Sequence, residues 1–317
     1  MLGPRPPETR FALSAQGSTP LLVGDRISAS GSRHAARLLR AGDYTGILDL
    51  AREQIQAGAW ALDVSVAERG RDDEIDRMCA VLARLRRAVS VPLLIDSIDP
   101  DVQLAALRLL GSGAIVNSVN LRGRLRPLAA VLAAARELRT AVVVQTIDER
   151  GLARTVDDKL RIAARAAQLL CGRYGLPPEA VIVDPLLFPL YSPSANASAP
   201  AGADAARATL DAIRRITSEL APVRTIVALR NASFGIPDGI PDGIPDGRML
   251  NGQIPGHRIF DASWARTRPL IESVLLHHAA VAGLSLALCD PSHITPYDAL
   301  PVRQRALAED LVFAPDP

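Results

Sequence analysis

Many apolar runs of this sequence end in a short polar side chain. Asp96, Asn117, Asp184 and Asn231 each end or directly follow such a run with a carboxylate or an amide. The set contains no histidine or cysteine, which makes it a poor metal site and a poor source of nucleophiles. Carboxylates accept paired hydrogen bonds from adjacent N–H groups, and amides match edges that carry both donors and acceptors, so the set suits a flat nitrogen heterocycle. The other candidates are Asp25, Asp63, Ser97 and Gln145, with Arg26, Arg230 and Ser233 beside such positions.

Any one of these residues also fits a simpler structural role, because Asp, Asn and Ser are favoured at turns and helix N-caps. Asp99 followed by Pro100 is such a case, with a capping residue and a proline at the first helical position. A polar residue closes nearly every run while the run interiors stay apolar. This recurrence favours a shared binding role over a set of unrelated turns.

The apolar runs alternate with longer helical patterns, which predicts a parallel sheet with crossover helices. Eight strand signals favour a closed (β/α)8 TIM barrel over an open sheet, and no GxGxxG motif follows the first of them. In such a barrel the carboxyl ends of the strands share one face, where reactive residues lie. We predict strands over 21–25, 60–66, 92–96, 114–119, 141–147, 180–184, 225–229 and 284–288, and helices over 33–39, 45–57, 72–88, 100–110, 125–138, 155–174, 204–220, 268–282 and 302–311.

The chain divides into an N-terminal extension (1–20), a barrel (21–290) and a C-terminal tail (291–317). The barrel carries a predicted insertion over 235–267, which begins with the repeat GIPDGIPDGIPDG. Proline removes backbone donors and glycine adds chain entropy, so this repeat cannot form a helix or a central strand. We interpret the segment as an insertion or a lid beside the seventh strand.

Composition narrows the class of protein. Of 317 residues, 48% are hydrophobic and the net charge is +2, and the arginines are scattered along helices, so we predict no nucleic-acid partner. No apolar run approaches the ~20 residues of a membrane span, and the first residues lack a signal-peptide core. The three cysteines lie far apart without a CxxC motif, which indicates reduced thiols. We therefore expect a cytoplasmic protein.

Eight pieces of the chain, in order, resemble one family: the pterin-binding methyltransferases that act on methyltetrahydrofolate. This family includes the folate domain of cobalamin-dependent methionine synthase and the methyltetrahydrofolate:corrinoid protein methyltransferases. The resemblance covers nearly the whole chain. Its pieces are VGDRISASGS (23–32), AGAWALDVSVAE (57–68), LLIDS (93–97), IVNSVN (115–120), VVVQTIDERGLART (142–155), VIVDPLLFPL (181–190), LRNASFGIP (229–237) and AGLSLALCDP (282–291).

The resemblance implies a pterin-binding barrel of the dihydropteroate synthase-like type and a reduced folate as ligand. It implies that Asp96, Asn117 and Asp184 hold the pterin ring, and that Asn231 hydrogen-bonds the ring at N5. Asn231 and Asp184 are the expected catalytic residues, with Ser97, Asp25, Asp63 and Gln145 as further pterin contacts. By analogy with the family we also expect a homodimer.

Several positions depart from the family pattern. The first strand usually ends in Gly-Glu-Arg with Asn two residues later, whereas this chain has Gly24-Asp25-Arg26 and then Ser28. Ser65 replaces an asparagine that often follows the second-strand aspartate, and Arg230 replaces a small residue before Asn231.

Three functions stay open at this point. In the first, 5-methyltetrahydrofolate donates its methyl group to cobalamin on a separate corrinoid protein, because the chain lacks a cobalamin-binding DxHxxG motif. In the second, a folate-dependent enzyme transfers a one-carbon unit directly to a small acceptor. In the third, the chain is a non-catalytic folate-binding subunit. Dihydropteroate synthase itself is disfavoured, because its Asn-x-Thr-x-Asp-Ser-Phe loop is absent after the first strand. No resident metal is predicted.

Overall fold

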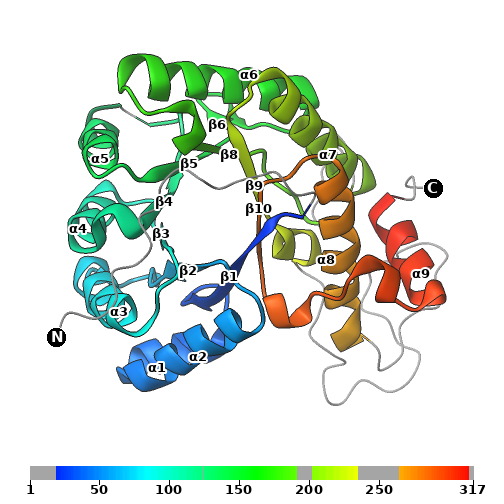
Figure 1. Cartoon of the computed structure of the whole chain (residues 1–317), viewed down its shortest axis with the longest axis horizontal. Helices are drawn as coiled ribbons and strands as arrows, with labels where there is room; N and C mark the ends of the chain where they lie inside the picture. The colour runs from blue at the N-terminus through cyan, green and yellow to red at the C-terminus, as the bar shows by residue number, and fades with distance from the viewer. Residues whose placement is uncertain (1–18, 124, 191–201, 235–263, 314–317) are drawn as a thin grey trace.

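Eight parallel strands close into a barrel in the order β1-β10-β9-β8-β5-β4-β3-β2, which confirms the predicted fold (Figure 1). The computed structural model describes residues 19–123, 125–190, 202–234 and 264–313. The strands are near-continuous apolar runs because both faces of each strand are covered. Their bounds are β1 Leu21–Ser28, β2 Ala61–Ser65, β3 Leu93–Asp96, β4 Ala114–Val119, β5 Ala141–Gln145, β8 Val181–Asp184, β9 Arg224–Ala228 and β10 Leu286–Cys289.

Helices surround the barrel, as Figure 1 shows. Sequence features set several of their ends: Asp99 caps α4 ahead of Pro100, and Gly42, with a φ of 65°, ends α1. Gly58 and Gly283, which follow α2 and α8, also have positive φ. The helices are α1 Arg33–Ala41, α2 Tyr44–Gln56, α3 Glu74–Ala88, α4 Pro100–Leu110, α5 Leu125–Glu137, α6 Val156–Ala167, α7 Gly202–Glu219, α8 Trp264–Val281 and α9 Val302–Phe313.

The barrel interior is a packed apolar core. Each strand contributes at least one buried aliphatic side chain to it, for example Val23 from β1, Ile115 from β4 and Ile226 from β9. Larger apolar clusters lie between the strands and the helices. A closed and filled interior leaves the carboxyl ends of the strands as the place where polar side chains can gather.

The structure differs from the sequence prediction at a few boundaries. Strand β1 runs on to Ser28, because its pairing with β2 resumes at Ile27 after a register shift at Asp25 and Arg26, where the apolar run is interrupted. The predicted helix 155–174 is α6 followed by a π-helical turn, η2 (Gln168–Arg173). A short hairpin, β6 (Ile147–Asp148) and β7 (Gly151–Leu152), follows β5. Helix α8 begins at Trp264, inside the predicted insertion, whose GIPDG repeat lies outside the described residues.

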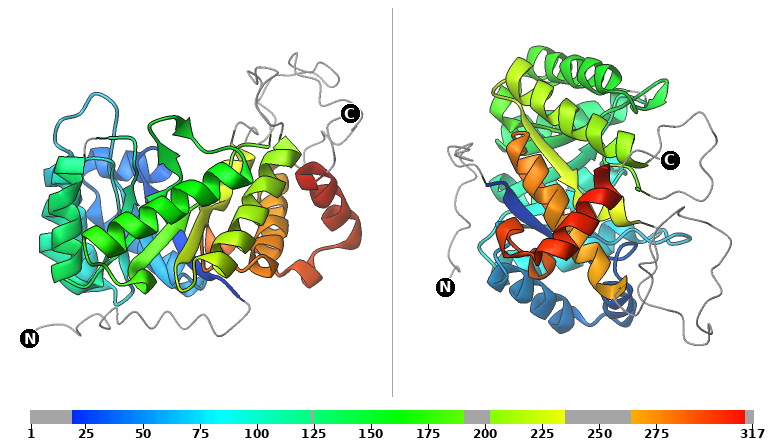
Figure 2. Two further views of the ribbon diagram at one scale, coloured as in Figure 1. Left: turned by 90° about the horizontal axis from the view of Figure 1, so that it is seen from above. Right: turned by 90° about the vertical axis from the view of Figure 1, so that its right-hand side faces the viewer.

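Helix α9, in the predicted C-terminal tail, packs against α7 and α8 (Figure 2). The imidazole of His277 stacks on the ring of Tyr297 at 3.8 Å, and His278 contacts Glu309. Both histidines therefore contact side chains of the C-terminal segment. Among the described helices, none combines the length and the apolar character needed to cross a bilayer.

Candidate functional site

Two carboxylates and one amide lie on three neighbouring strands, β2, β3 and β4. The Asn117 amide on β4 donates to the Asp63 carboxylate on β2 at 2.9 Å. Asp96 on β3 pairs in register with Asn117 and accepts a hydrogen bond from Ser65. Ser65 therefore supplies a hydroxyl to Asp96 at the position where the family often has asparagine. With Gln145 and Asp184 these residues form what we call the acid–amide group (Asp63, Asp96, Asn117, Gln145 and Asp184).

Burial makes the carboxyls of this group hard to ionise. Burial and the neighbouring Asp96 raise the pKa of Asp63 well above its usual range, while the bond from Asn117 opposes the rise. Burial raises the pKa of Asp96 to about 6, although the hydrogen bond from Ser65 opposes the rise. Within the described residues, no lysine or arginine forms an ion pair with either carboxyl. A ligand with N–H donors would supply what these acceptors lack.

Asp184 completes the acid–amide group from the end of β8. It pairs in register with Gln145, which also hydrogen-bonds its carboxylate. The Leu186 amide donates to Asp184 Oδ1 at 2.8 Å, so the turn after the strand fixes the orientation of the carboxyl. Burial raises the pKa of Asp184 to about 6.

A second set of polar side chains occupies the other side of the barrel mouth. The Arg230 guanidinium donates to Asp25 Oδ1 at 2.5 Å and to the Gly31 carbonyl at 2.9 Å. It thereby joins η4 (Leu229–Ser233), which follows β9, to β1 and the loop beyond it. Burial raises the pKa of Asp25 to about 6 although Arg230 opposes the rise. Two departures from the family pattern, Asp25 and Arg230, are thus in direct contact.

Glu272 belongs to this second set but was missed in the sequence, where it lies within a predicted helix. It is buried on α8, and Ser233 Oγ lies 3.3 Å from its Oε1. Burial raises its pKa to about 7, and the charge of Asp25 adds to the rise. Ser233 also donates to the Arg230 carbonyl, at 3.1 Å. We call the set the arginine group (Asp25, Arg26, Arg230, Ser233, Glu272 and Asp290).

Arg26 faces outward from β1 toward α2 and β10. Its guanidinium contacts Glu53 at 2.9 Å and Asp290 at 3.5 Å, and its backbone N–H donates to Gln54 Oε1. Gln54 is buried so close to β1 that a Cβ on Gly24 would lie 2.5 Å from its Oε1. A side chain at position 24 would therefore have to displace the Gln54 amide that accepts from the Arg26 N–H.

The remaining predicted residues occupy the loops. The Ser97 hydroxyl donates to Glu74 at 2.6 Å and accepts from the Asp99 amide, so it is engaged within the loop after β3. Ser28 is buried and accepts from the Gly31 amide at 3.0 Å. Asn231 lies on η4 with an exposed side chain, which makes no hydrogen bond to another described residue.

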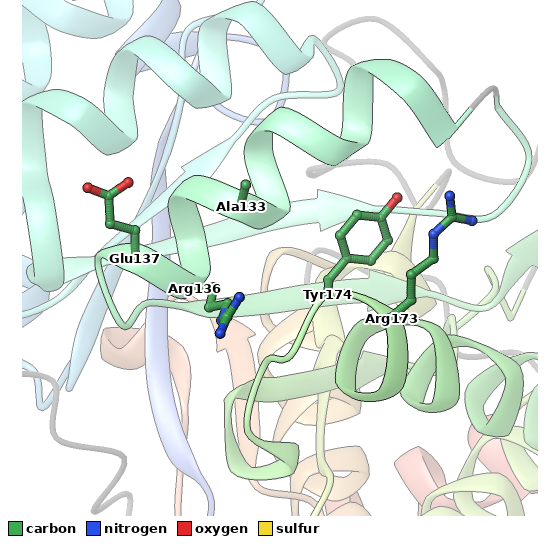
Figure 3. A pocket seen from close by; sticks show the side chains of 5 residues that line it. All are labelled: Ala133, Arg136, Glu137, Arg173 and Tyr174. Carbon is green, nitrogen blue, oxygen red and sulfur yellow. The ribbon is translucent and has the colours of Figure 1, made fainter.

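A surface cavity of about 350 Å³ lies elsewhere, between α5 and η2. Figure 3 shows its lining, which consists of Ala133, Arg136 and Glu137 from α5 together with Arg173 and Tyr174. The crossover helices run opposite to the strands, so the end of α5 lies at the amino ends of the strands, away from the mouth. In the described part of the chain, no three His, Cys, Asp or Glu side chains come together as a metal site. Cys79, Cys171 and Cys289 are free thiols, of which only Cys289 is fully buried.

The closed barrel and its polar mouth define a class of protein, and comparison with known families agrees. The family described as pterin binding enzyme matches residues 24–288, and the chain belongs to this family. It is 32% identical over 302 residues to methionine synthase of Mycobacterium tuberculosis H37Rv, and 31% identical to that of Mycobacterium leprae. These matches cover 94% of this chain but only 23% and 22% of the two relatives, so the chain spans less than a quarter of their length.

Solved structures agree on the fold. A dihydropteroate synthase of Xanthomonas albilineans, in complex with 7,8-dihydropteroate, superposes with a TM-score of 0.56 at 17% identity over 94% of both chains. The dihydropteroate synthase of Thermus thermophilus superposes with a TM-score of 0.54 at 20% identity, covering 87% of this chain and 90% of that one. At such identities the likeness concerns the barrel alone.

Proposed function

We propose that this chain binds 5-methyltetrahydrofolate by its pterin ring and donates the N5-methyl group to a corrinoid carried by a partner protein. One observation carries the folate part of the proposal: the buried Asp63 and the half-buried Asp96 and Asp184 are acceptors with raised pKa values at one side of the mouth. The similarity of almost the whole chain to part of methionine synthase supports methyl transfer over other pterin chemistry.

The pterin ring presents an N–H-rich edge that fits this set of acceptors. In the proposed complex Asp184 and Asp96 accept from the ring N–H and amino groups, and Asn117 satisfies an edge with both donor and acceptor atoms. Asn117 is already oriented by its bond to Asp63, and Asp184 by the Leu186 amide. Pre-oriented partners lower the entropy lost on binding. Gln145 extends the acid–amide group beside Asp184.

Activation of the methyl group is the task proposed for Asn231. The N5-methyl is a poor electrophile, because its leaving group would be an amide-like anion. A hydrogen bond that strengthens as electron density builds on N5 lowers the barrier. The Asn231 side chain is exposed and has no hydrogen-bond partner among the described residues, so its amide is free to donate to a ligand.

The acceptor is proposed to arrive on another protein or domain. Cobalamin, when bound there, supplies the nucleophile that takes the methyl group. The residues of this chain would hold and orient the folate and activate N5. The chain spans under a quarter of its methionine synthase relatives, which is consistent with a corrinoid carrier outside these residues. We expect a homodimer in solution and a cytoplasmic location.

Isothermal titration with 5-methyltetrahydrofolate tests the ligand, and single-turnover transfer to protein-bound cob(I)alamin, followed by absorbance, tests the reaction. We expect saturable binding with one folate per chain and loss of the cob(I)alamin spectrum. Binding without transfer to corrinoid would overturn the proposed acceptor and favour direct transfer to a small molecule or a non-catalytic folate-binding subunit. Absence of binding by any reduced folate would overturn the proposed function as a whole.

A further inference from the structure

One buried lysine lies directly behind the proposed pterin-binding carboxylate. Lys159, on α6, is 0% exposed. Its ammonium lies 2.6 Å from the Pro185 carbonyl, 2.7 Å from the Leu186 carbonyl and 3.0 Å from Thr209 Oγ1. An ammonium has three N–H donors, and these three acceptors use all of them. Within the described residues it forms no ion pair with a carboxylate, although the charge of Asp184 acts on it.

Such a charge is costly to bury. Removing an ion from water is unfavourable even after the protein relaxes, and an apolar side chain of similar volume would avoid that cost. The buried face of α6 otherwise carries apolar residues such as Ile162 and Ala166. A lysine in that stripe must therefore gain something that a leucine or methionine would not.

The Lys159 ammonium binds the carbonyls of the turn that follows β8. Leu186 has a φ of 62°, a left-handed conformation that is unfavourable for a branched side chain. Its carbonyl is held by both Lys159 and Thr209, which sets the orientation of the residue. The amide of the same Leu186 donates to Asp184 Oδ1 at 2.8 Å. Leu186 therefore links the Lys159 ammonium to the Asp184 carboxylate, through its carbonyl on one side and its amide on the other.

We propose that Lys159 is a positioning residue for Asp184, holding the turn at 185–186 so that the carboxylate faces the pterin ring. This proposal rests on the proposed function. Lys159 also favours the ionised form of Asp184, and its charge opposes the rise in the pKa of that carboxyl. The groups that act on the Asp184 carboxyl are Lys159 from α6, Gln145 from β5 and the Leu186 amide, and Arg154 acts on Lys159 in turn.

The test compares Lys159→Met with Ile162→Ala in the full chain. Methionine keeps the length of the side chain but removes the charge and the donors. Ile162 is equally buried on α6, and the alanine variant loses packing while leaving the ammonium in place. Two readouts are needed: the pKa of Asp184, from carboxyl ¹³C shifts assigned with Asp184→Asn, and the pH profile of 5-methyltetrahydrofolate binding.

We expect Lys159→Met to raise the pKa of Asp184 by about one pH unit, since an opposite charge nearby is lost. Folate affinity at pH 7 should fall about tenfold or more, and the pH midpoint of binding should move upward by the same interval. Ile162→Ala should lower stability without moving either midpoint. Thr209→Val, which removes one acceptor and leaves the charge, should produce a smaller loss of affinity with little change in the midpoint.

The two proposals fail in different ways. If the wild-type chain binds folate and Lys159→Met binds it with the same affinity and pH profile, the role of Lys159 is overturned and the proposed function stands. If the wild-type chain binds no reduced folate, the proposed function fails. The ¹³C titration then still decides whether Lys159 acts on Asp184, because that readout needs no ligand. An unchanged Asp184 pKa in Lys159→Met would overturn the positioning role in either case.

Discussion

The two sides of the barrel mouth carry buried carboxyls in opposite settings. In the arginine group, Asp25 is paired with Arg230, and Asp290 lies 3.5 Å from Arg26. In the acid–amide group, Asp63 and Asp96 face an amide and a hydroxyl, with no ion pair to a described cation. An internal ion pair meets the electrostatic needs of a buried carboxylate, whereas an unpaired one needs protonation or a ligand. The comparison indicates that Asp25 and Asp290 are held by cations within the protein, whereas Asp63 and Asp96 are acceptors for the donors of a ligand.

The largest effect should come from removing the acceptors of the acid–amide group. Asp184→Asn and Asp96→Asn each turn an acceptor toward a ring donor into a competing donor. Losing a charge-assisted hydrogen bond and leaving its partner unpaired costs about 3 to 4 kcal/mol. We therefore expect affinity for 5-methyltetrahydrofolate to fall on the order of several hundredfold, measured by isothermal titration.

The matched control for these variants is Asp290→Asn. Asp290 is a buried carboxylate at the mouth, but Ser292 donates to it twice, from the backbone N–H and from the hydroxyl. We expect folate affinity to change less than about fivefold, because this carboxylate is satisfied within the protein. Equal losses of folate affinity in Asp184→Asn and Asp290→Asn would show that the two sides of the mouth do not differ in this respect.

The next largest effect should come from Asn231, which lies at the boundary between the two groups. Asn231 lies on η4 between Arg230 and Ser233, yet it is proposed to act on the pterin ring. Removing one hydrogen-bond donor to developing charge costs about 3 kcal/mol. Asn231→Ala should lower the single-turnover methyl transfer rate about a hundredfold while folate affinity changes little. An unchanged rate would remove Asn231 from the mechanism.

Binding should also depend on pH through the acid–amide group. The free carboxyls of Asp96 and Asp184 have pKa values raised to about 6, and ring donors favour their ionised forms. A bound ring should lower both pKa values, so affinity is full above pH 6 and is lost as the pH falls through 6. Between pH 7.5 and 5 we expect a loss of about tenfold for each carboxyl that contacts the ring. Titration of the free ligand alone corrects for protonation of the folate.

Much of the fold could be predicted because buried parallel strands leave a plain signal. All eight strands were found within a few residues of their bounds, and Asp99 with Pro100 marked the start of α4. Strand β1 was predicted too short, because Asp25 and Arg26 interrupt its apolar run. Hydropathy cannot show that a strand continues past a polar residue such as Asp25, whose partner Arg230 lies about two hundred residues away in the sequence.

The candidate site was only partly predictable for the same physical reason. The strand-end positions of Asp96, Asn117 and Asp184 followed from local patterns together with barrel geometry. Lys159 and Glu272 were missed because charged residues in a helix are usually solvated. A signal was present in the helical period, since Lys159 lies three and seven residues before the buried Ile162 and Ala166. A charged residue at an apolar position of the helical period therefore indicates a buried charge.

The smallest effect should come from Glu272 in the arginine group, and it concerns the free energy of unfolding. Burial raises the pKa of Glu272 from 4.5 to about 7, with Arg230 as its nearby cation. A carboxyl whose folded-state pKa is raised contributes stability that is full below the unfolded value and is lost as the pH rises through 7. Glu272→Gln keeps the shape and a partner for Ser233 but has no charge to bury. Relative to the wild-type chain, its free energy of unfolding should therefore increase by about 2 kcal/mol between pH 5 and pH 8. Urea unfolding at the two pH values measures this difference. A variant that is destabilised at pH 8 would mean that the Glu272 charge is needed to hold Arg230, and that the arginine group depends on its full set of charges.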